Sequence, residues 1–249
     1  MLLAADRASR GWITIDGTPA LRCWWSPAAA RDRVVLVLPE VFGVNEWVRD
    51  VADHIASVGV CALAMPLFAR TAPELDLGYS DVELAKGRRH KEATSTDQIQ
   101  ADAAMAIAWL QQMAAAKPDP PSVTVVGFCF GGHAALLTAV LPQVSTTLSF
   151  YGAGISHSRP GGGPPSLELL SQIRGQFTYI CGSTDPLIPV SERTAIASAI
   201  ALADPSAKRL RYIEVTGACH GFMREERGIL DAKAATIGWQ LIDKQLTRR

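Results

Sequence analysis

A cysteine in a glycine-rich turn is the residue of this sequence best placed to do chemistry. Residues 125–133 read VVGFCFGGH, and an Ala- and Leu-rich helical pattern follows them directly. The spacing G-x-C-x-G is that of a nucleophile elbow, a sharp strand-to-helix turn, with cysteine where serine is usual. Gly127 and Gly131 must be small there so that strand and helix can approach each other. We expect Cys129 at a helix N-terminus, where the helix dipole favours the thiolate; the alternative is a buried structural cysteine.

An acid and a histidine follow the cysteine in the order that such a site requires. Asp185 ends the motif GSTD after an apolar run, and His220 follows the last predicted strand. Taken singly, Asp185 could be a loop or capping aspartate and His220 a surface histidine. Together they predict a triad in which His220 takes the proton of Cys129 and Asp185 orients the imidazole. Cys129 would then attack an acyl carbon and form a thioester that water hydrolyses.

Two backbone groups and three aromatic side chains complete the predicted site. The N–H of Phe130, in the first turn of the helix, is free to point at an oxyanion. A second N–H is expected from Val41, because residues 38–43 (LPEVFG) follow a central strand where this donor normally lies. Phe42, Phe130 and Phe222 are expected to form an apolar wall around the substrate.

Glu40 is unusual beside a thiol nucleophile. A carboxylate at this strand end could compete with His220 for the proton of Cys129, or it could repel a thiolate and keep the resting thiol neutral. It could equally be a loop glutamate in a salt bridge.

The elements expected to position these residues alternate between strand and helix. Short β-branched or apolar runs predict strands at residues 12–15, 20–25, 33–38, 60–64, 122–126, 147–151, 177–181 and 211–215. Helical periodicity is present at residues 46–57, 96–116, 131–141, 190–203 and 228–246. This alternation is typical of a doubly wound α/β sandwich. Residues 70–93 are polar and mixed, and 155–165 form a Gly/Pro loop, which we interpret as flexible because it lacks the Lys-Ser/Thr ending of a phosphate cradle.

Composition excludes several other classes of protein. The 249 residues carry 24 Lys+Arg and 24 Asp+Glu, so no net positive charge supports nucleic-acid binding. The basic run at 88–91 is interpreted as ordinary solvated surface. The apolar runs are far shorter than a membrane span, and no signal-peptide pattern opens the chain. Five scattered cysteines favour a reduced, cytoplasmic protein. We expect one domain over 1–249, a monomer, and no nucleic-acid or membrane partner.

A metal site is the main alternative chemistry. Cys129 and His133 are four residues apart on a predicted helix, a spacing that can bind metal, but no third ligand and no H-E-x-x-H motif accompany them. We therefore expect no metal and no cofactor. Cys219, next to His220, could be a redox partner of Cys129 or a small core residue.

These motifs resemble those of the dienelactone hydrolase family, within the α/β-hydrolase superfamily. The resemblance rests on PEVFGVN from Pro39, GFCFGG from Gly127, GSTD from Gly182 and HGFMR from His220. It implies an α/β-hydrolase fold, with a mostly parallel, twisted sheet of about eight strands and helices on both faces. It also implies a small-molecule substrate, a cyclic enol-lactone (4-carboxymethylenebut-2-en-4-olide) hydrolysed to maleylacetate without a cofactor.

The resemblance assigns roles to individual residues as well. It implies a Cys129–His220–Asp185 triad and a Glu40 that hydrogen-bonds the resting thiol. It implies that Arg224 clamps the substrate carboxylate. The family's second arginine has no match at the expected place, although Arg70 or Arg88 could replace it. The remaining alternatives are an esterase or thioesterase of another substrate class, and a non-catalytic binding protein of the same fold.

Overall fold

In the part of the chain that the structure describes, eight strands join one sheet. The computed structural model describes residues 9–114, 120–224 and 232–247. The sheet order is β1-β2-β4-β3-β5-β6-β7-β8, with antiparallel pairs only where β2 meets β1 and β4. The strands are Gly11–Ile15 (β1), Leu21–Ser26 (β2), Ala30–Leu38 (β3), Val60–Ala64 (β4), Ser122–Phe128 (β5), Val144–Phe150 (β6), Gln176–Gly182 (β7) and Leu210–Val215 (β8). The prediction of about eight mostly parallel strands is therefore confirmed.

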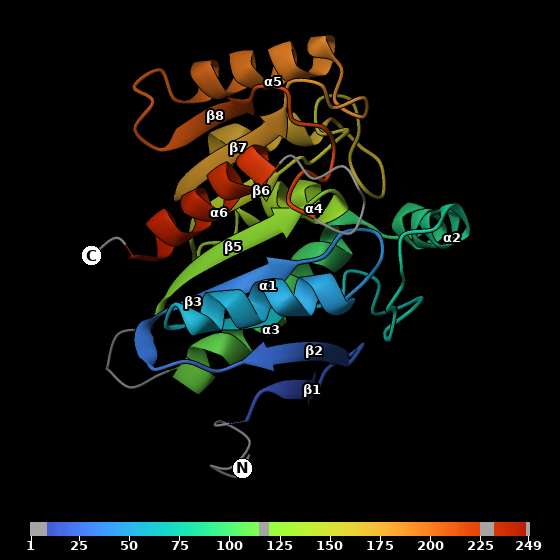
Figure 1. Cartoon of the computed structure of the whole chain (residues 1–249), viewed down its shortest axis with the longest axis vertical. Helices are drawn as coiled ribbons and strands as arrows, with labels where there is room; N and C mark the ends of the chain where they lie inside the picture. Colours follow the sequence, from blue (N-terminus) through green and yellow to red (C-terminus); the bar gives the residue numbers. More distant parts are fainter. Residues whose placement is uncertain (1–8, 115–119, 225–231, 248–249) are drawn as a thin grey trace.

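Helices cover both faces of this sheet (Figure 1). They are Glu46–Ser57 (α1), Asp81–Glu92 (α2), Thr96–Ala114 (α3), Phe130–Thr138 (α4), Val190–Ala203 (α5) and Ala232–Thr247 (α6), with a 3-10 helix at Ser166–Gln172 (η1). The helices α1 and α6 lie on one face and α3 on the other. The bounds of α1 and α5 match the prediction. The predicted start of the last helix, Gly228, lies outside the described residues.

The alternating β-branched runs explain why both faces are buried. In β3, Val35 and Val37 point into the core under α1 and α6, and Val34, Leu36 and Leu38 point into the core under α3. None of these five side chains has measurable exposure. A strand buried on both faces reads as a continuous apolar run, which is the pattern seen in the sequence.

Helix α2 is the element that the sequence reading missed. It lies inside the polar segment 70–93 and begins at a capping box, in which Ser80 accepts from the N–H of Glu83 and Glu83 accepts from the N–H of Ser80. A capping box marks a helix N-terminus in a sequence, so the start of α2 could have been predicted. Gly87 is the only buried residue of α2, and Figure 1 shows the helix standing beside the sheet rather than on it. Without an apolar face, periodicity could not reveal it.

The middle of the Gly/Pro loop at 155–165 is held against the start of α3. Thr96 donates to Pro160 O from its backbone N–H and its hydroxyl, each at 2.9 Å. Gly161 packs against Ser95, where a Cβ would lie 2.5 Å from the Ser95 Cβ. The loop therefore closes over the N-terminus of α3.

Within the described residues, no helix is both long and apolar enough to cross a bilayer.

Candidate active site

Cys129 lies in the sharp turn between β5 and α4. Its backbone has φ 54° and ψ −117°, a left-handed value that non-glycine residues rarely adopt. The turn is closed by two neighbours without side chains: a Cβ at Gly127 would lie 2.0 Å from Gly131 O, and one at Gly131 would lie 2.2 Å from Leu38 O. The prediction that both glycines must be small is confirmed. The turn exposes the side chain of Cys129 at the carboxyl end of the parallel strands.

His220 and Asp185 form a buried pair beside this turn. The Nδ1 of His220 lies 2.8 Å from Asp185 Oδ2, and the other carboxylate oxygen accepts from the N–H of Leu187 at 2.8 Å. The side chain of Asp185 has no exposure and that of His220 is 7% exposed. The Asp185 carboxylate can only accept at Nδ1, so Nδ1 carries a proton and Nε2 faces Cys129.

The loops that carry the pair are packed together at their bases. Thr184 donates to Ala218 O from its N–H at 3.1 Å and from its hydroxyl at 2.8 Å. A Cβ at Gly182 would lie 2.1 Å from the same carbonyl. These contacts fix the spacing between the loop of Asp185 and the loop of His220.

A thiolate at Cys129 would act on His220. Burial lowers the pKa of His220, but interaction with the thiolate form of Cys129 and with Asp185 together outweighs burial and raises the pKa to about 10. The Nε2 atom is close enough to Cys129 for this effect, although it meets hydrogen-bond geometry with no described group. Such bonds often tighten only when substrate is bound.

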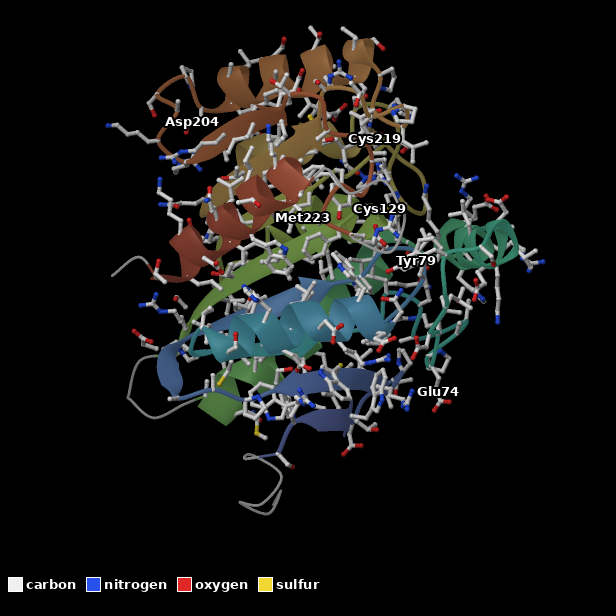
Figure 2. The ribbon with its side chains drawn as sticks, viewed as in Figure 1. Glu74, Tyr79, Cys129, Asp204, Cys219 and Met223 are labelled. Carbon is white, nitrogen blue, oxygen red and sulfur yellow. The ribbon has the colours of Figure 1, made fainter. Side chains whose placement is uncertain are left out.

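These residues line a cavity of about 520 Å³. The other lining residues include apolar side chains, namely Val41, Phe42, Leu84, Phe130, Pro186 and Leu187. In the view of Figure 2, Cys129 and Cys219 project toward the same edge of the sheet, and both line this cavity. A larger hollow of about 750 Å³ lies around Val140 and Arg209 and contains none of the predicted site residues.

Glu40 and Arg224 form an ion pair in the cavity wall. Arg224 Nη1 lies 3.0 Å from Glu40 Oε2, and both side chains are buried. The guanidinium also lies over the Tyr79 ring, 4.4 Å from its centroid. Burial lowers the pKa of Arg224, but Glu40, Tyr151 and Tyr79 together outweigh burial and raise it. Glu40 therefore forms a salt bridge with Arg224, and it also lines the cavity that contains Cys129.

The two predicted oxyanion donors are available. Phe130 is the first residue of α4, and Val41 follows the end of β3. Among the described residues, neither backbone N–H has an acceptor. Both residues line the cavity with Cys129, so both donors lie at the same opening.

Two cations of α2 line the cavity: Arg88, one of the two candidates for the family's second arginine, and Lys91, which was not expected there. Arg88 and Lys91 of α2 are exposed, as a solvated surface would be, but they also line the cavity. Neither forms an ion pair among the described residues, and Lys91 Nζ lies 5.7 Å from the Phe130 ring centroid. Arg70, the other candidate for a second arginine, pairs instead with Asp102 at 2.7 Å. With the capping box of α2 recognised, the i, i+3 spacing of Arg88 and Lys91 would have placed them on one side of a helix.

Other predicted residues take no part in this cavity. Phe222 is fully buried and packs on Tyr151, with ring centroids 5.3 Å apart, and it does not line the cavity. His133 is bonded through Nδ1 to Ala153 O at 3.1 Å and through Nε2 to the Ser166 hydroxyl at 2.7 Å. Both of its nitrogens are thus engaged away from Cys129. Among the described residues, no group of three or more His, Cys, Asp or Glu is arranged to hold a metal ion.

The chain is similar to known hydrolases over most of its length. The model of the dienelactone hydrolase family matches residues 23–248. A candidate carboxymethylenebutenolidase of Synechocystis sp. is 38% identical over 213 residues, which cover 86% of this chain and 84% of that protein. The carboxymethylenebutenolidase of Pseudomonas putida is 27% identical over 217 residues, covering 85% and 84%.

Solved structures share the fold. A candidate dienelactone hydrolase of Klebsiella pneumoniae superposes with a TM-score of 0.83 at 21% identity, over 97% of this chain and 99% of that one. An α/β serine hydrolase homologue of Coxiella burnetii superposes with a TM-score of 0.60 at 15% identity, over 91% and 94%. The chain therefore has the α/β-hydrolase fold that the motifs implied.

Proposed function

The chain belongs to the dienelactone hydrolase family, whose members hydrolyse lactones and carboxylic esters, and we propose that it does so with Cys129 as the nucleophile. One observation carries this proposal. A cysteine in a strained elbow shares a cavity with a histidine that is hydrogen-bonded to a buried aspartate. That set supplies a nucleophile, a base and a group that orients the base.

The reaction follows from the positions of these groups. The proton of Cys129 passes to His220 Nε2 and gives a thiolate–imidazolium pair, which the raised pKa of His220 favours, and the sulfur then attacks the carbonyl carbon of the substrate. The negative charge on the carbonyl oxygen is stabilised by the N–H groups of Val41 and Phe130. The C–O bond of the ester or lactone breaks, and His220 returns the proton to the leaving oxygen. Water, deprotonated by His220, then hydrolyses the thioester and frees Cys129.

We propose an anionic substrate with an apolar body. Apolar side chains line much of the cavity, and its charged lining residues are cations except for Glu40, which is paired. Arg224 lies at the inner wall and its charge is balanced by Glu40, so a substrate carboxylate would have to compete for it. Arg88 and Lys91 have no such competitor. We therefore place the substrate carboxylate at Arg88 and Lys91, and the carbonyl at Cys129.

The test compares two cysteines of the same cavity. Cys129→Ala should abolish hydrolysis of 4-carboxymethylenebut-2-en-4-olide, and Cys219→Ala, the matched control, should leave most of it. His220→Ala should lower the rate by about 10³-fold or more. Mass spectrometry of a quenched reaction should find the acyl group on Cys129. Hydrolysis by Cys129→Ala at the wild-type rate would refute the proposal.

A further inference from the structure

Tyr151 occupies a strained position directly behind the site. It is the first residue after β6, and its backbone has φ 39°. Its N–H donates to Ile180 O at 2.7 Å, which fixes the backbone at this point. A bulky residue at positive φ costs free energy of order 1–3 kcal/mol and persists where the surroundings impose it. The backbone strain at Tyr151 therefore indicates that the direction of its side chain is functionally important.

The ring of Tyr151 packs against the imidazole of His220. Their centroids are 5.1 Å apart at an interplanar angle of 64°, and the ring of Phe222 packs on Tyr151 from another side. Asp185 holds His220 through Nδ1 alone. The Tyr151 ring restricts rotation of the imidazole about that bond, because the ring has no exposure and is itself immobilised.

The hydroxyl of Tyr151 is buried without a hydrogen-bond partner among the described residues. An unsatisfied buried hydroxyl is costly, and phenylalanine would fill the same space without that cost. Tyr151 is not a lining residue of the cavity, so the hydroxyl does not serve substrate directly.

Tyr151 lies beside the elbow, because the N–H of Cys129 donates to the carbonyl of Phe150, the residue before Tyr151, at 3.0 Å. Burial raises the pKa of Tyr151 well above its ordinary value, Glu40 raises it further, Arg224 opposes this, and Cys129 and Tyr79 add smaller increases. His220 is the titratable group whose ring packs on it. The phenol thus keeps its proton and stays a hydrogen-bond donor.

We propose that Tyr151 is a positioning residue whose hydroxyl stabilises the negative charge that develops at Cys129 beside Glu40, while its ring holds His220 in line. The inference rests on the proposed function only in taking Cys129 as the nucleophile. It assigns no contact with substrate. In the resting protein the Tyr151 hydroxyl has no acceptor among the described residues, and it donates to the thiolate of Cys129 once this forms.

The test measures the thiolate without any substrate. The rate of alkylation of Cys129 by iodoacetamide is followed against pH by peptide mass spectrometry. Tyr151→Phe keeps the ring and removes the donor, so we expect the apparent pKa of Cys129 to rise by about 0.5 unit or more, because loss of a donor disfavours the charged form. We expect kcat for lactone hydrolysis to fall about three- to tenfold with KM unchanged. Tyr151→Leu, which also removes the ring contact, should shift the profile further.

Tyr179→Phe is the matched control. The Tyr179 hydroxyl is also buried, but it donates to Gly152 O at 2.8 Å. Its loss should lower stability without moving the alkylation profile. A Tyr151→Phe profile that superposes on the wild type would overturn the inference, even if Cys129→Ala is inactive as proposed. If the alkylation profile of Tyr151→Phe shifts but the wild-type enzyme hydrolyses no lactone, the result would support the role of Tyr151 and would count against the proposed substrate.

Discussion

Arg224 and Glu40 neutralise each other inside the protein, with Nη1 and Oε2 3.0 Å apart. Each lies in a loop that follows a strand, Glu40 after β3 and Arg224 after β8. A lone charge at either position would lack both water and a counter-ion. The pair therefore joins the loop of the predicted oxyanion donor Val41 to the loop of His220.

Removing one partner of this pair should be costly. Arg224→Met is expected to lower the free energy of unfolding by about 3–5 kcal/mol, because the buried carboxylate of Glu40 loses the arginine of its ion pair. Adding Glu40→Gln should restore part of the loss. Urea denaturation measures both. The control is Arg10→Met, which breaks an ion pair with Asp53 in which Arg10 is 64% exposed, and which should cost about 1 kcal/mol or less. Equal losses for the two arginines would contradict the prediction.

The elbow should not tolerate a methyl group at Gly131. Gly131→Ala would place its Cβ 2.2 Å from Leu38 O and 2.4 Å from Pro39 O, and backbone atoms cannot move aside cheaply. We expect a loss of at least about 2 kcal/mol of stability together with a large loss of activity. Gly78→Ala is the control, since its nearest neighbour is the flexible carboxylate of Glu83 at 3.0 Å. Thermal unfolding in which both variants behave alike would argue against the steric account.

The cations of α2 should select charged substrates. Arg88→Ala and Lys91→Ala are each expected to raise KM about tenfold for a lactone that bears a carboxylate, and less than about twofold for a neutral lactone of the same size. Arg89→Ala is the matched control, because Arg89 belongs to the same exposed run but does not line the cavity. Steady-state kinetics on the two lactones decide the matter. If only Arg224→Ala discriminates between them, the carboxylate binds at the inner wall instead.

His220 should make stability fall at alkaline pH. Its folded pKa of about 10 lies above the ordinary 6.5, so its contribution is complete below pH 6.5 and is lost as pH rises toward 10. Cys129→Ser removes the largest cause that raises this pKa. In that variant the imidazole NMR signal of His220 should titrate at a lower pH, and the decline in unfolding free energy above pH 7 should be smaller. An unchanged titration would contradict the role of the Cys129 charge.

His133 should act in the opposite pH range. Burial lowers its pKa to about 4, so the folded protein resists protonating it while the unfolded chain does not. Its contribution is present above pH 6.5 and is lost as pH falls toward 4, a change of about 3 kcal/mol. His133→Gln should flatten the stability curve between pH 6.5 and 4. Urea denaturation across this range is the measurement, and an equally steep decline in the variant would refute it.

That Cys129, Asp185 and His220 lie together could be predicted from the sequence, because each is in a loop that follows an obvious strand. Parallel strands bring their carboxyl ends to one edge, so the order of Cys129, Asp185 and His220 was sufficient to expect them together. The glycines flanking Cys129 were equally readable, since their need for close approach is local. In the same way, the continuous apolar runs revealed β3 to β8 with errors of a few residues at their ends.

Contacts between distant, polar segments were beyond such reasoning. Helix α2 has no apolar face, so nothing in its pattern said that it turns Arg88 and Lys91 toward the cavity. The pairing of Glu40 with Arg224 depends on how two loops approach each other in space, which spacing does not encode. The position of Phe222 close to His220 in the sequence predicted that it lines the cavity, but the loop directs its side chain into the core.

Helix α2 contacts the loop that follows β3, which carries Val41, at Gly87. A Cβ at Gly87, the only buried residue of α2, would lie 2.2 Å from Val41 O, so the helix rests directly on the backbone of a proposed oxyanion donor. The exposed residues of α2 include Arg88 and Lys91, which line the cavity. Substitutions at these exposed positions would therefore change the charge of the cavity without removing the contact that seats the helix. A redesigned helix should keep Gly87, because a side chain at that position would collide with the backbone of Val41.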